Sequence, residues 1–332
     1  MLLSSAPAQL ILAACDLALA PLALLVLLPV SSWLTAKERQ EMPVPSGATL
    51  HHVIVSPKGR ANGRLFFING WPDTLLLFQS VARKLSAAGF ECVLMSMPGF
   101  PTLATPTDLP AIIQGTIPNR KWGFSFKETC QMLANTIVSV NNARGAIENG
   151  EICLVGHDWG VIVCYILLSK HSPQELGLTR FVSLDVGLLK KMPGKMALLV
   201  AIYQIYLNIA WMCPTFLGDL LTRGMATMID APAKTTACAA HNGFYREMIR
   251  TVALKEWQGY KLELPREIPT VFCYGTLGPS WSWWSNQEFR DQVLATSSIS
   301  RVESFAGGHW FFVGEEEDKF IKVLEEFLES RG

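Results

Sequence analysis

The chain has 332 residues, with 28 acidic and 28 basic side chains and a formal net charge of zero. Charged residues make up 17% of the sequence and hydrophobic residues 50%, whereas an average soluble domain carries about 25% charged residues. A neutral chain lacks the basic surface that nucleic acid requires, and so apolar a composition excludes intrinsic disorder. The length suffices for one large domain with an insertion or for two domains.

The shortage of charge begins near the N-terminus. Residues 10–30 form a 21-residue apolar stretch whose only charge is Asp16, close to the roughly 20 residues that span a bilayer. No Lys or Arg precedes this stretch, whereas Lys37 and Arg39 follow it, so we expect a membrane anchor rather than a removed signal peptide or a core helix. The positive-inside rule then places the rest of the chain on the cytoplasmic face, and we expect the endoplasmic reticulum membrane.

The eight cysteines favour a reducing compartment. None of them forms a Cys-x-x-Cys pair, and Cys153 and Cys273 lie inside apolar runs that are typical of buried strands. We interpret the cysteines as small core residues rather than as a disulfide framework or a zinc site. The absence of an Asn-x-Ser/Thr sequon removes one sign of a lumenal domain.

Beyond the anchor, short apolar runs alternate with helical patterns. The expected strands are residues 50–55, 64–68, 92–95, 152–155, 181–184, 270–274 and 300–305. The expected helices are residues 78–88, 126–142, 161–169, 287–295 and 319–328. This alternation predicts an α/β fold with a mostly parallel sheet covered by helices on both faces.

Two segments interrupt the alternation. Residues 100–122 are rich in Pro and Thr and are expected to form a loop, whereas residues 187–262 have helical patterns and no clear strand. A helical insertion in an open sheet is a candidate lid over an active site. The predicted organisation is an anchor over residues 1–36, a core over residues 37–186 and 263–332, and a helical cap between them.

The hexapeptide at residues 155–160, Val-Gly-His-Asp-Trp-Gly, lies between an expected strand and an expected helix. It matches the nucleophile elbow, in which small residues flank a side chain held on a sharp strand-to-helix turn. Asp158 occupies the nucleophile position, and a carboxylate there attacks an alkyl electrophile to form a covalent ester. By itself the hexapeptide favours an ordinary strand-to-helix turn with a solvated aspartate, because short motif matches carry false positives.

Two further segments favour catalysis. Residues 69–72, Asn-Gly-Trp-Pro, end an earlier strand, and we expect the backbone N–H groups of Trp71 and Trp159 to form a two-donor oxyanion hole. His309 follows the last strand, where it suits a general base that activates water, although a structural loop histidine is the alternative. A nucleophile followed by a histidine near the C-terminus is the order of the α/β-hydrolase fold.

From about residue 50 to the C-terminus, the chain resembles the epoxide hydrolase branch of the α/β-hydrolases. The resemblance is carried by the Asn-Gly-Trp-Pro loop at residues 69–72, the His-Asp-Trp-Gly elbow at residues 157–160 and the Gly-His-Trp turn at residues 308–310. It implies the α/β-hydrolase fold with an inserted helical cap. It also implies hydrolysis of an epoxide to a vicinal diol through an Asp158 ester, with neither a metal nor an organic cofactor.

In that family, two cap tyrosines hold the epoxide oxygen while the aspartate attacks carbon. Tyr203, in Tyr-Gln-Ile-Tyr, and Tyr245, in Phe-Tyr-Arg, match those two positions. A phenol suits this role because the ring oxygen leaves as an alkoxide that accepts a hydrogen bond or a proton. We interpret Tyr206, three residues after Tyr203, as a core residue.

The chain departs from the family at two places. Asn69 stands where histidine is usual, and residues 275–279, Gly-Thr-Leu-Gly-Pro, carry no carboxylate where the triad acid is usual. A histidine base needs an acceptor on its other ring nitrogen. We predict that Asp185, at the end of the strand at residues 181–184, replaces the missing acid, as related dehalogenases place theirs there.

Two other functions fit parts of the pattern. A haloalkane or haloacid dehalogenase shares Asp158 and His309 but does not need the cap tyrosines. An inactive hydrolase fold that serves as a membrane-tethered binding protein accords with the missing acid at residues 275–279. For the enzyme, the apolar cap and the anchor together predict a small lipophilic substrate that partitions from the membrane.

Overall fold

The structure of the protein is a computed structural model. It describes residues 44–100, 113–117, 123–145, 147, 150–188, 194–260, 262–277 and 287–330. The predicted anchor at residues 10–30 lies outside these residues. Within the described part of the chain, we find no helix whose length and apolar character would let it cross a membrane.

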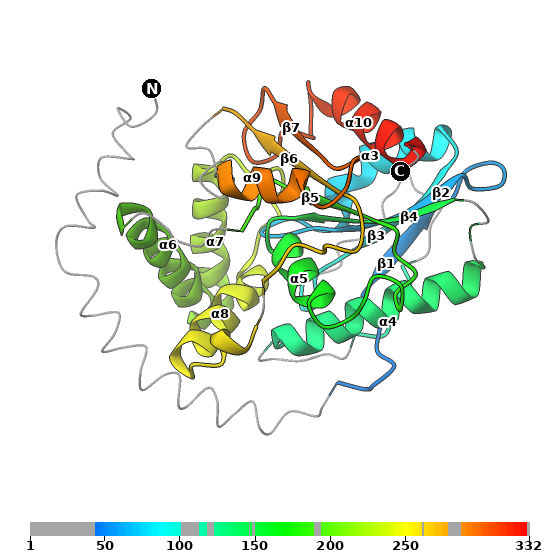
Figure 1. Ribbon diagram of the computed structural model, residues 1–332. Coiled ribbons are helices and arrows are strands. Elements are labelled where there is room, and N and C mark those ends of the chain that lie inside the picture. Colours follow the sequence, from blue (N-terminus) through cyan, green and yellow to red (C-terminus); the bar gives the residue numbers. More distant parts are fainter. Residues whose placement is uncertain are drawn as a thin grey trace.

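The described strands form one seven-stranded sheet in the order β1-β3-β2-β4-β5-β6-β7 (Figure 1). They are β1 (His52–Val55), β2 (Gly63–Ile68), β3 (Phe90–Met95), β4 (Glu151–His157), β5 (Arg180–Leu184), β6 (Thr270–Gly275) and β7 (Arg301–Phe305). All neighbouring pairs are parallel except β1 with β3, which is antiparallel. The mostly parallel sheet predicted from the sequence is therefore confirmed, with one antiparallel strand at its edge.

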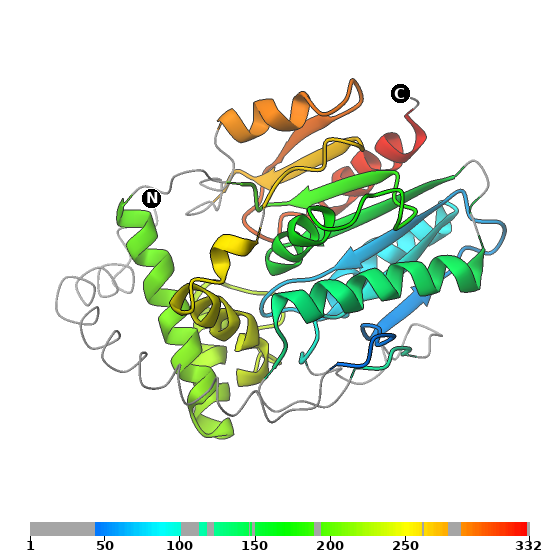
Figure 2. The same ribbon diagram turned by 60° about the horizontal axis from the view of Figure 1, so that its bottom comes forward.

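Helices cover both faces of the sheet (Figure 2). The helices α4 (Phe126–Arg144) and α5 (Trp159–Leu168) pack on one face, with Phe66 and Ile68 of β2. The helices α3 (Gln79–Ala87) and α10 (Glu317–Glu329) pack on the other, with Leu65 and Phe67. Successive side chains of a strand point to opposite faces, so an uninterrupted apolar run fills both layers of the core. The remaining core helix, α9 (Gln287–Leu294), lies beside β6 and β7.

The structure shifts the ends of several predicted elements. β4 continues to His157, two residues beyond the predicted end, because Gly156 still pairs with β2 and β5 and His157 still pairs with β5. The apolar pattern stops earlier since glycine is a poor strand residue. α5 correspondingly begins at Trp159 instead of residue 161, and a 3-10 turn, Leu75–Phe78, precedes α3.

Helices make up most of the described residues between β5 and β6, where the sequence predicted helical patterns and no clear strand. It contains α6 (Gly194–Met212), α7 (Thr215–Met228) and α8 (Gly243–Ala253), with 3-10 turns at Ala239–Asn242 and Trp257–Gly259. α6 packs against both α7 and α8, and these helices lie together at one end of the sheet (Figure 1, Figure 2). A Cβ atom on Gly218 would lie 2.3 Å from the carbonyl oxygen of Ala210, so glycine permits the close approach of α6 and α7.

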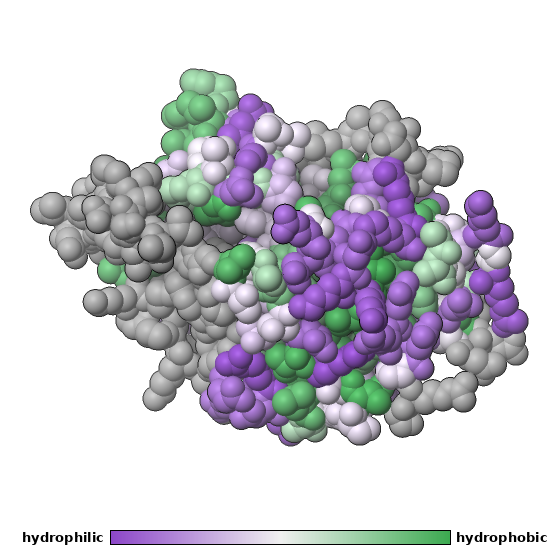
Figure 3. All heavy atoms as spheres, turned by 90° about the horizontal axis from the view of Figure 1, so that it is seen from above, coloured by the Kyte–Doolittle hydropathy of each residue, from purple (hydrophilic) through white to green (hydrophobic). Residues whose placement is uncertain are grey.

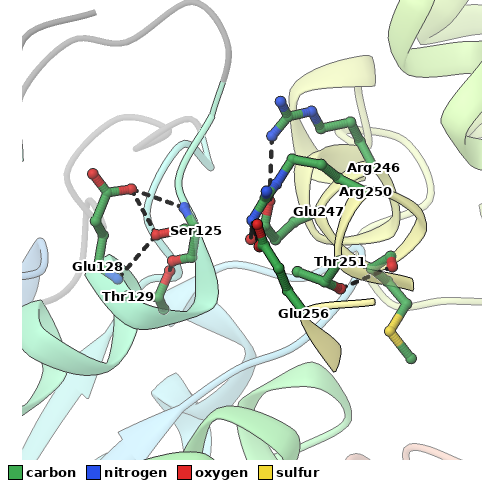
Figure 4. A network of polar contacts seen from close by, with 9 residues as sticks. Ser125, Glu128, Thr129, Arg246, Glu247, Arg250, Thr251 and Glu256 are labelled. Carbon is green, nitrogen blue, oxygen red and sulfur yellow. Dashed lines mark hydrogen bonds and ion pairs between the residues drawn. The ribbon is translucent and has the colours of Figure 1, made fainter. Parts of the chain in front are cut away.

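A partly buried ion network joins α8 to the following turn (Figure 4). Glu247 is fully buried and accepts hydrogen bonds from Arg250 Nε at 2.7 Å and Nη2 at 2.8 Å. Arg250 also lies 2.8 Å from Glu256, just before the Trp257–Gly259 turn. A buried carboxylate needs such partners, because an unpaired one would be strongly destabilising.

The outer surface of α6 and α7 is apolar. The exposed large hydrophobic side chains on these helices are Leu198, Ile209, Met212, Phe216, Leu217, Leu220 and Met228. The face seen from above in Figure 3, which carries α9 and α10, is by contrast largely hydrophilic over the described residues. The core helices thus present charged faces to solvent, whereas the cap presents apolar side chains.

Candidate active site

Asp158 occupies a sharp turn between β4 and α5. Its backbone has φ 52° and ψ −122°, a left-handed conformation that is strained for any residue except glycine. A Cβ atom on Gly70 would lie 2.5 Å from that of Asp158, and one on Gly160 would lie 2.5 Å from the Ile68 carbonyl oxygen. The two glycines therefore allow the turn to pack on β2, with 22% of the Asp158 side chain exposed.

Two backbone N–H groups face the Asp158 carboxylate. The Trp71 N–H donates to Asp158 Oδ2 at 2.7 Å. Desolvation raises the pKa of Asp158, and the His309 imidazole and the backbone N–H groups of Trp159 and Trp71 partly oppose that rise. The predicted pair of donors thus lies beside the predicted nucleophile, in the arrangement that stabilises an oxyanion.

Asn69 shapes the loop that carries Trp71. Its side chain is fully buried, and its Nδ2 donates to the carbonyl oxygens of Gly70 at 3.0 Å and Asp73 at 2.5 Å. The amide therefore ties the two ends of the turn together. Asparagine at this position closes the loop so that the Trp71 N–H points toward Asp158.

His309 lies between the two predicted aspartates. Its Nδ1 is 2.7 Å from Asp185 Oδ2, and its Nε2 is 3.7 Å from Asp158 Oδ1. The Gly275 N–H donates to Asp185 Oδ1 at 3.0 Å. Asp185 thus approaches from the end of β5 and is held by the end of β6, the strand after which the triad acid is usual.

The groups around His309 determine its pKa and which ring nitrogen carries the proton. Burial is the largest single effect and lowers the pKa of His309, but the hydrogen bond to Asp185 and the charges of Asp185, Asp158 and Asp73 together raise the pKa above its ordinary value. Burial also raises the pKa of Asp185, against the opposing effect of His309. With its Nδ1–H donated to Asp185, neutral His309 presents an unprotonated Nε2 toward Asp158, as a general base requires.

Tyr203 on α6 and Tyr245 on α8 lie near Asp158, whose charge acts on both hydroxyl groups. The rings of Tyr203 and Tyr245 are 5.7 Å apart and nearly perpendicular. Tyr245 also packs edge-on against Trp159, with 5.3 Å between ring centroids. Burial and the Asp158 charge raise the pKa of both phenols, so both remain protonated donors. Tyr206, by contrast, donates to the Leu221 carbonyl oxygen at 3.0 Å, as expected of a structural residue.

Comparisons with known proteins identify the fold. A family model described as the alpha/beta hydrolase fold matches residues 63–316. The chain belongs to this family. No curated protein sequence matches the chain.

Solved structures of hydrolases resemble this α/β-hydrolase. An epoxide hydrolase from Vigna radiata is 16% identical with a TM-score of 0.53, over 87% of this chain and 97% of that one. Epoxide hydrolase A from Mycobacterium thermoresistibile is 15% identical with a TM-score of 0.54, over 87% and 98%. An esterase from Exiguobacterium antarcticum is 13% identical with a TM-score of 0.56, over 85% and 96%. At such identities the likeness shows the fold and leaves the reaction to be argued from the site.

Asp73 is a site residue that the sequence reasoning missed. It is 1% exposed, and its Oδ2 accepts a hydrogen bond from Trp310 Nε1 at 2.7 Å. Burial raises the pKa of Asp73 to about 7, with a further rise from Asp158, while Trp310 and His309 act in the opposite direction. In the sequence, Asp73 directly follows Asn-Gly-Trp-Pro, the loop predicted to form part of the oxyanion hole, and this position is the signal that could have indicated a site residue.

The raised pKa of Asp73 predicts a pH-dependent stability. The folded protein keeps the proton up to pH about 7, whereas an unfolded Asp releases it near pH about 3.9. This stabilisation is complete below the unfolded pKa and is lost as the pH rises through the folded one. Wild type should therefore lose stability relative to Asp73→Asn by up to about 1.4 kcal/mol per pH unit in that window. Urea unfolding from pH 4 to 8 measures the difference, and parallel profiles would contradict it.

The described residues contain no cluster of three or more His, Cys, Asp or Glu side chains that could hold a metal ion. The seven described cysteines are free thiols, and Cys153 and Cys273 are buried in β4 and β6, as the sequence predicted.

Proposed function

We propose that this α/β-hydrolase converts lipophilic epoxides to vicinal diols through a covalent ester at Asp158. The observation that carries the proposal is an aspartate at the strand-to-helix elbow whose charge acts on two nearby phenols, Tyr203 and Tyr245. A carboxylate attacks saturated carbon, and phenols donate to an oxygen that leaves that carbon. An esterase needs neither property, because its nucleophile attacks a carbonyl group.

In the first step, an oxygen of Asp158 attacks one epoxide carbon. A carbon–oxygen bond to the protein forms while the ring carbon–oxygen bond breaks. Tyr203 and Tyr245 donate hydrogen bonds to the departing ring oxygen, and one of them transfers its proton. The product is a hydroxyalkyl ester of Asp158 and one tyrosinate, so the total charge is unchanged.

In the second step, His309 Nε2 removes a proton from water, which attacks the carbonyl carbon of the ester. The backbone N–H groups of Trp71 and Trp159 stabilise the oxyanion, and Asp185 stabilises the imidazolium. Collapse of the intermediate breaks the bond to the alkyl oxygen, which takes the proton from His309. The diol leaves, and the remaining acid proton restores the tyrosine.

A panel of substrates tests the proposed function. We expect diol from styrene oxide and from fatty-acid epoxides with wild type, and none with Asp158→Ala. Turnover of haloalkanes but of no epoxide would favour a dehalogenase, and turnover of neither would favour a binding protein. The missing acid at residues 275–279 no longer favours the binding protein, since Asp185 lies 2.7 Å from His309 Nδ1.

The cap tyrosines distinguish epoxide from halide chemistry. Tyr203→Phe and Tyr245→Phe should each slow formation of the ester about 10²-fold, because each removes one donor to the leaving oxygen. Single-turnover kinetics with an epoxide measure this step. Tyr206→Phe is the matched control, since its hydroxyl bonds the Leu221 carbonyl oxygen and should leave the rate unchanged. Wild-type rates in both of the first two variants would refute the tyrosine roles.

We also propose that the apolar stretch at residues 10–30 anchors the enzyme in the endoplasmic reticulum membrane, with the catalytic part on the cytoplasmic side. The near absence of charge in that stretch and the exposed Phe216 and Leu220 of the cap support a lipophilic setting. The full chain should remain in the membrane pellet after carbonate extraction, and deletion of residues 1–36 should release it. Recovery of the full chain in the supernatant would contradict the anchor.

A further inference from the structure

A chain of buried hydrogen bonds joins the oxyanion loop to the cap. The Trp71 indole Nε1 donates to Asn242 Oδ1 at 2.8 Å. Asn242 Nδ2 donates to Thr222 Oγ1 at 2.7 Å, and Thr222 Oγ1 donates to the Gly218 carbonyl oxygen at 2.7 Å. Asn242 and Thr222 are fully buried, and Trp71 is 4% exposed. We call these four residues the Trp71–Gly218 chain.

In the Trp71–Gly218 chain, each hydrogen bond can have only one of its two atoms as the donor. An indole N–H donates and never accepts, so the amide oxygen of Asn242 must face it. The Asn242 NH2 group is then the donor to Thr222, whose hydroxyl proton is left for the Gly218 carbonyl oxygen. Since these side chains are buried away from water, reversing any member would leave a buried donor or acceptor unpaired, which is unfavourable. The chain therefore holds its four residues in one arrangement.

Both halves of the proposed catalytic machinery meet at this chain. On the core side, Trp71 supplies the backbone N–H that donates to Asp158 Oδ2. On the cap side, Asn242 is the residue immediately before α8, and Tyr245 lies in the first turn of that helix. The rings of Trp71 and Tyr245 are 5.7 Å apart and nearly perpendicular. Asn242 thus lies between the residue that carries the oxyanion donor, Trp71, and the residue that carries the phenol, Tyr245.

The other end of the Trp71–Gly218 chain lies at the close contact between α6 and α7. Gly218 lies where α6 and α7 touch, since a Cβ atom there would approach the Ala210 carbonyl oxygen to 2.3 Å. Tyr203 is on α6, seven residues before Ala210. Through Gly218, the chain also ties the helix that carries the first cap tyrosine to the oxyanion loop.

We propose that Asn242 is a positioning residue that aligns the cap with the oxyanion loop, through Trp71 on one side and Thr222 on the other. This inference rests on the proposed function. Tyr245 acts in the formation of the ester and the Trp71 N–H in its hydrolysis, so loss of the alignment slows both steps. A displacement of about 1 Å in such a site costs about 10²-fold in rate.

Asn242→Leu, in the full chain, tests the proposal because leucine has a similar volume and neither hydrogen-bonding group. We expect single-turnover rate constants for ester formation and ester hydrolysis to fall about 10²-fold each, with a much smaller change in KM. Thr222→Val, which keeps the shape of the side chain, should lower both constants in the same direction. Thr222→Ser, which keeps the hydroxyl, should restore most of the lost rate.

Thr251→Val is the matched control. Thr251 is as buried as Thr222, and its hydroxyl likewise donates within its own helix, to the Met248 carbonyl oxygen of α8, but Thr251 is not part of the Trp71–Gly218 chain. The Thr251→Val variant should lose stability as Thr222→Val does, but it should keep the wild-type rate constants for both steps. A general weakening of the cap would slow both valine variants, whereas the positioning role predicts a loss in Thr222→Val alone.

Trp71→Phe completes the test, since it removes the indole donor and keeps the backbone N–H of residue 71. Trp71→Phe and Asn242→Leu both remove the same hydrogen bond of the Trp71–Gly218 chain. The double variant should therefore be no slower than the slower single variant. Rates within about 3-fold of wild type in a folded Asn242→Leu, or in Thr222→Val where the former does not fold, would overturn the proposal. Failure of wild type to form the ester would instead overturn the proposed function, and intact-mass measurement shows which has failed.

Discussion

Asp158→Ala is expected to lower the rate of the proposed epoxide hydrolysis by a factor on the order of 10⁴ or more, because it removes the proposed nucleophile. Wild type in heavy-oxygen water should incorporate the label into Asp158 over many turnovers. The reason is that water attacks the carbonyl carbon of the ester, so one of its oxygens remains in the regenerated carboxylate. Mass spectrometry of the peptide that contains Asp158 measures the incorporation.

A single-turnover experiment and a control variant complete the test of this prediction. In a single turnover, the oxygen added to the diol should come from Asp158 and carry no label. Labelled diol with unlabelled Asp158 would show direct attack of water on the epoxide. Asp230→Ala is the matched control, because Asp230 also has a positive φ, of 55°, but is 83% exposed and pairs with Lys234. That variant should keep wild-type rates.

Asp185→Asn is expected to slow hydrolysis of the ester by about 10³- to 10⁴-fold and to affect its formation far less. The amide keeps the shape of the carboxylate but loses the charge that stabilises the His309 imidazolium. Since the second step then becomes slow, the ester should accumulate. Intact-mass measurement would show a species heavier by the mass of the epoxide.

The pH dependence gives a second readout for the same variant. The hydrogen bond to Asp185 and its charge are the largest effects that raise the pKa of His309, and only neutral His309 accepts a proton from water. In the ester Asp158 carries no charge, so the rate of ester hydrolysis in wild type should rise with pH through the pKa of His309 that the Asp185 charge supports. Without the Asp185 charge the pKa falls, so the inflection should move to lower pH. An unchanged hydrolysis rate in Asp185→Asn would end the assignment of Asp185 as the acid.

The features readable from the sequence are those encoded by neighbouring residues. The elbow around Asp158 is one continuous hexapeptide, since a strand, a tight glycine-flanked turn and a helix follow one another along the chain. The parallel sheet follows from the alternation of apolar runs and helices. The two positions for cap tyrosines were matched from short segments around Tyr203 and Tyr245.

The features that escaped prediction depend on contacts between distant segments. Asp73 bonds Trp310 across 237 positions of the sequence, and its pKa is raised because that packing excludes water. Asn242 meets Trp71 across 171 positions, although nothing in its own segment distinguishes it from an ordinary residue before a helix. β1 pairs antiparallel with β3, whereas its apolar pattern alone is compatible with either direction.

By itself, the amino-acid sequence determined the order of strands and helices, the nucleophile position of Asp158 and the candidate base, His309. It also pointed to Asp185 as the acid, because a carboxylate directly after an apolar strand lies at the carboxyl edge of the sheet. Only the tertiary structure decided that Asp185 lies 2.7 Å from His309, that both cap phenols lie near Asp158, and that a chain of buried hydrogen bonds joins the cap to the oxyanion loop. The reason is physical: local conformation follows from residues a few positions apart, whereas distances, burial and pKa values are set by packing between segments more than 80 residues apart, as with Trp71 and Asp158.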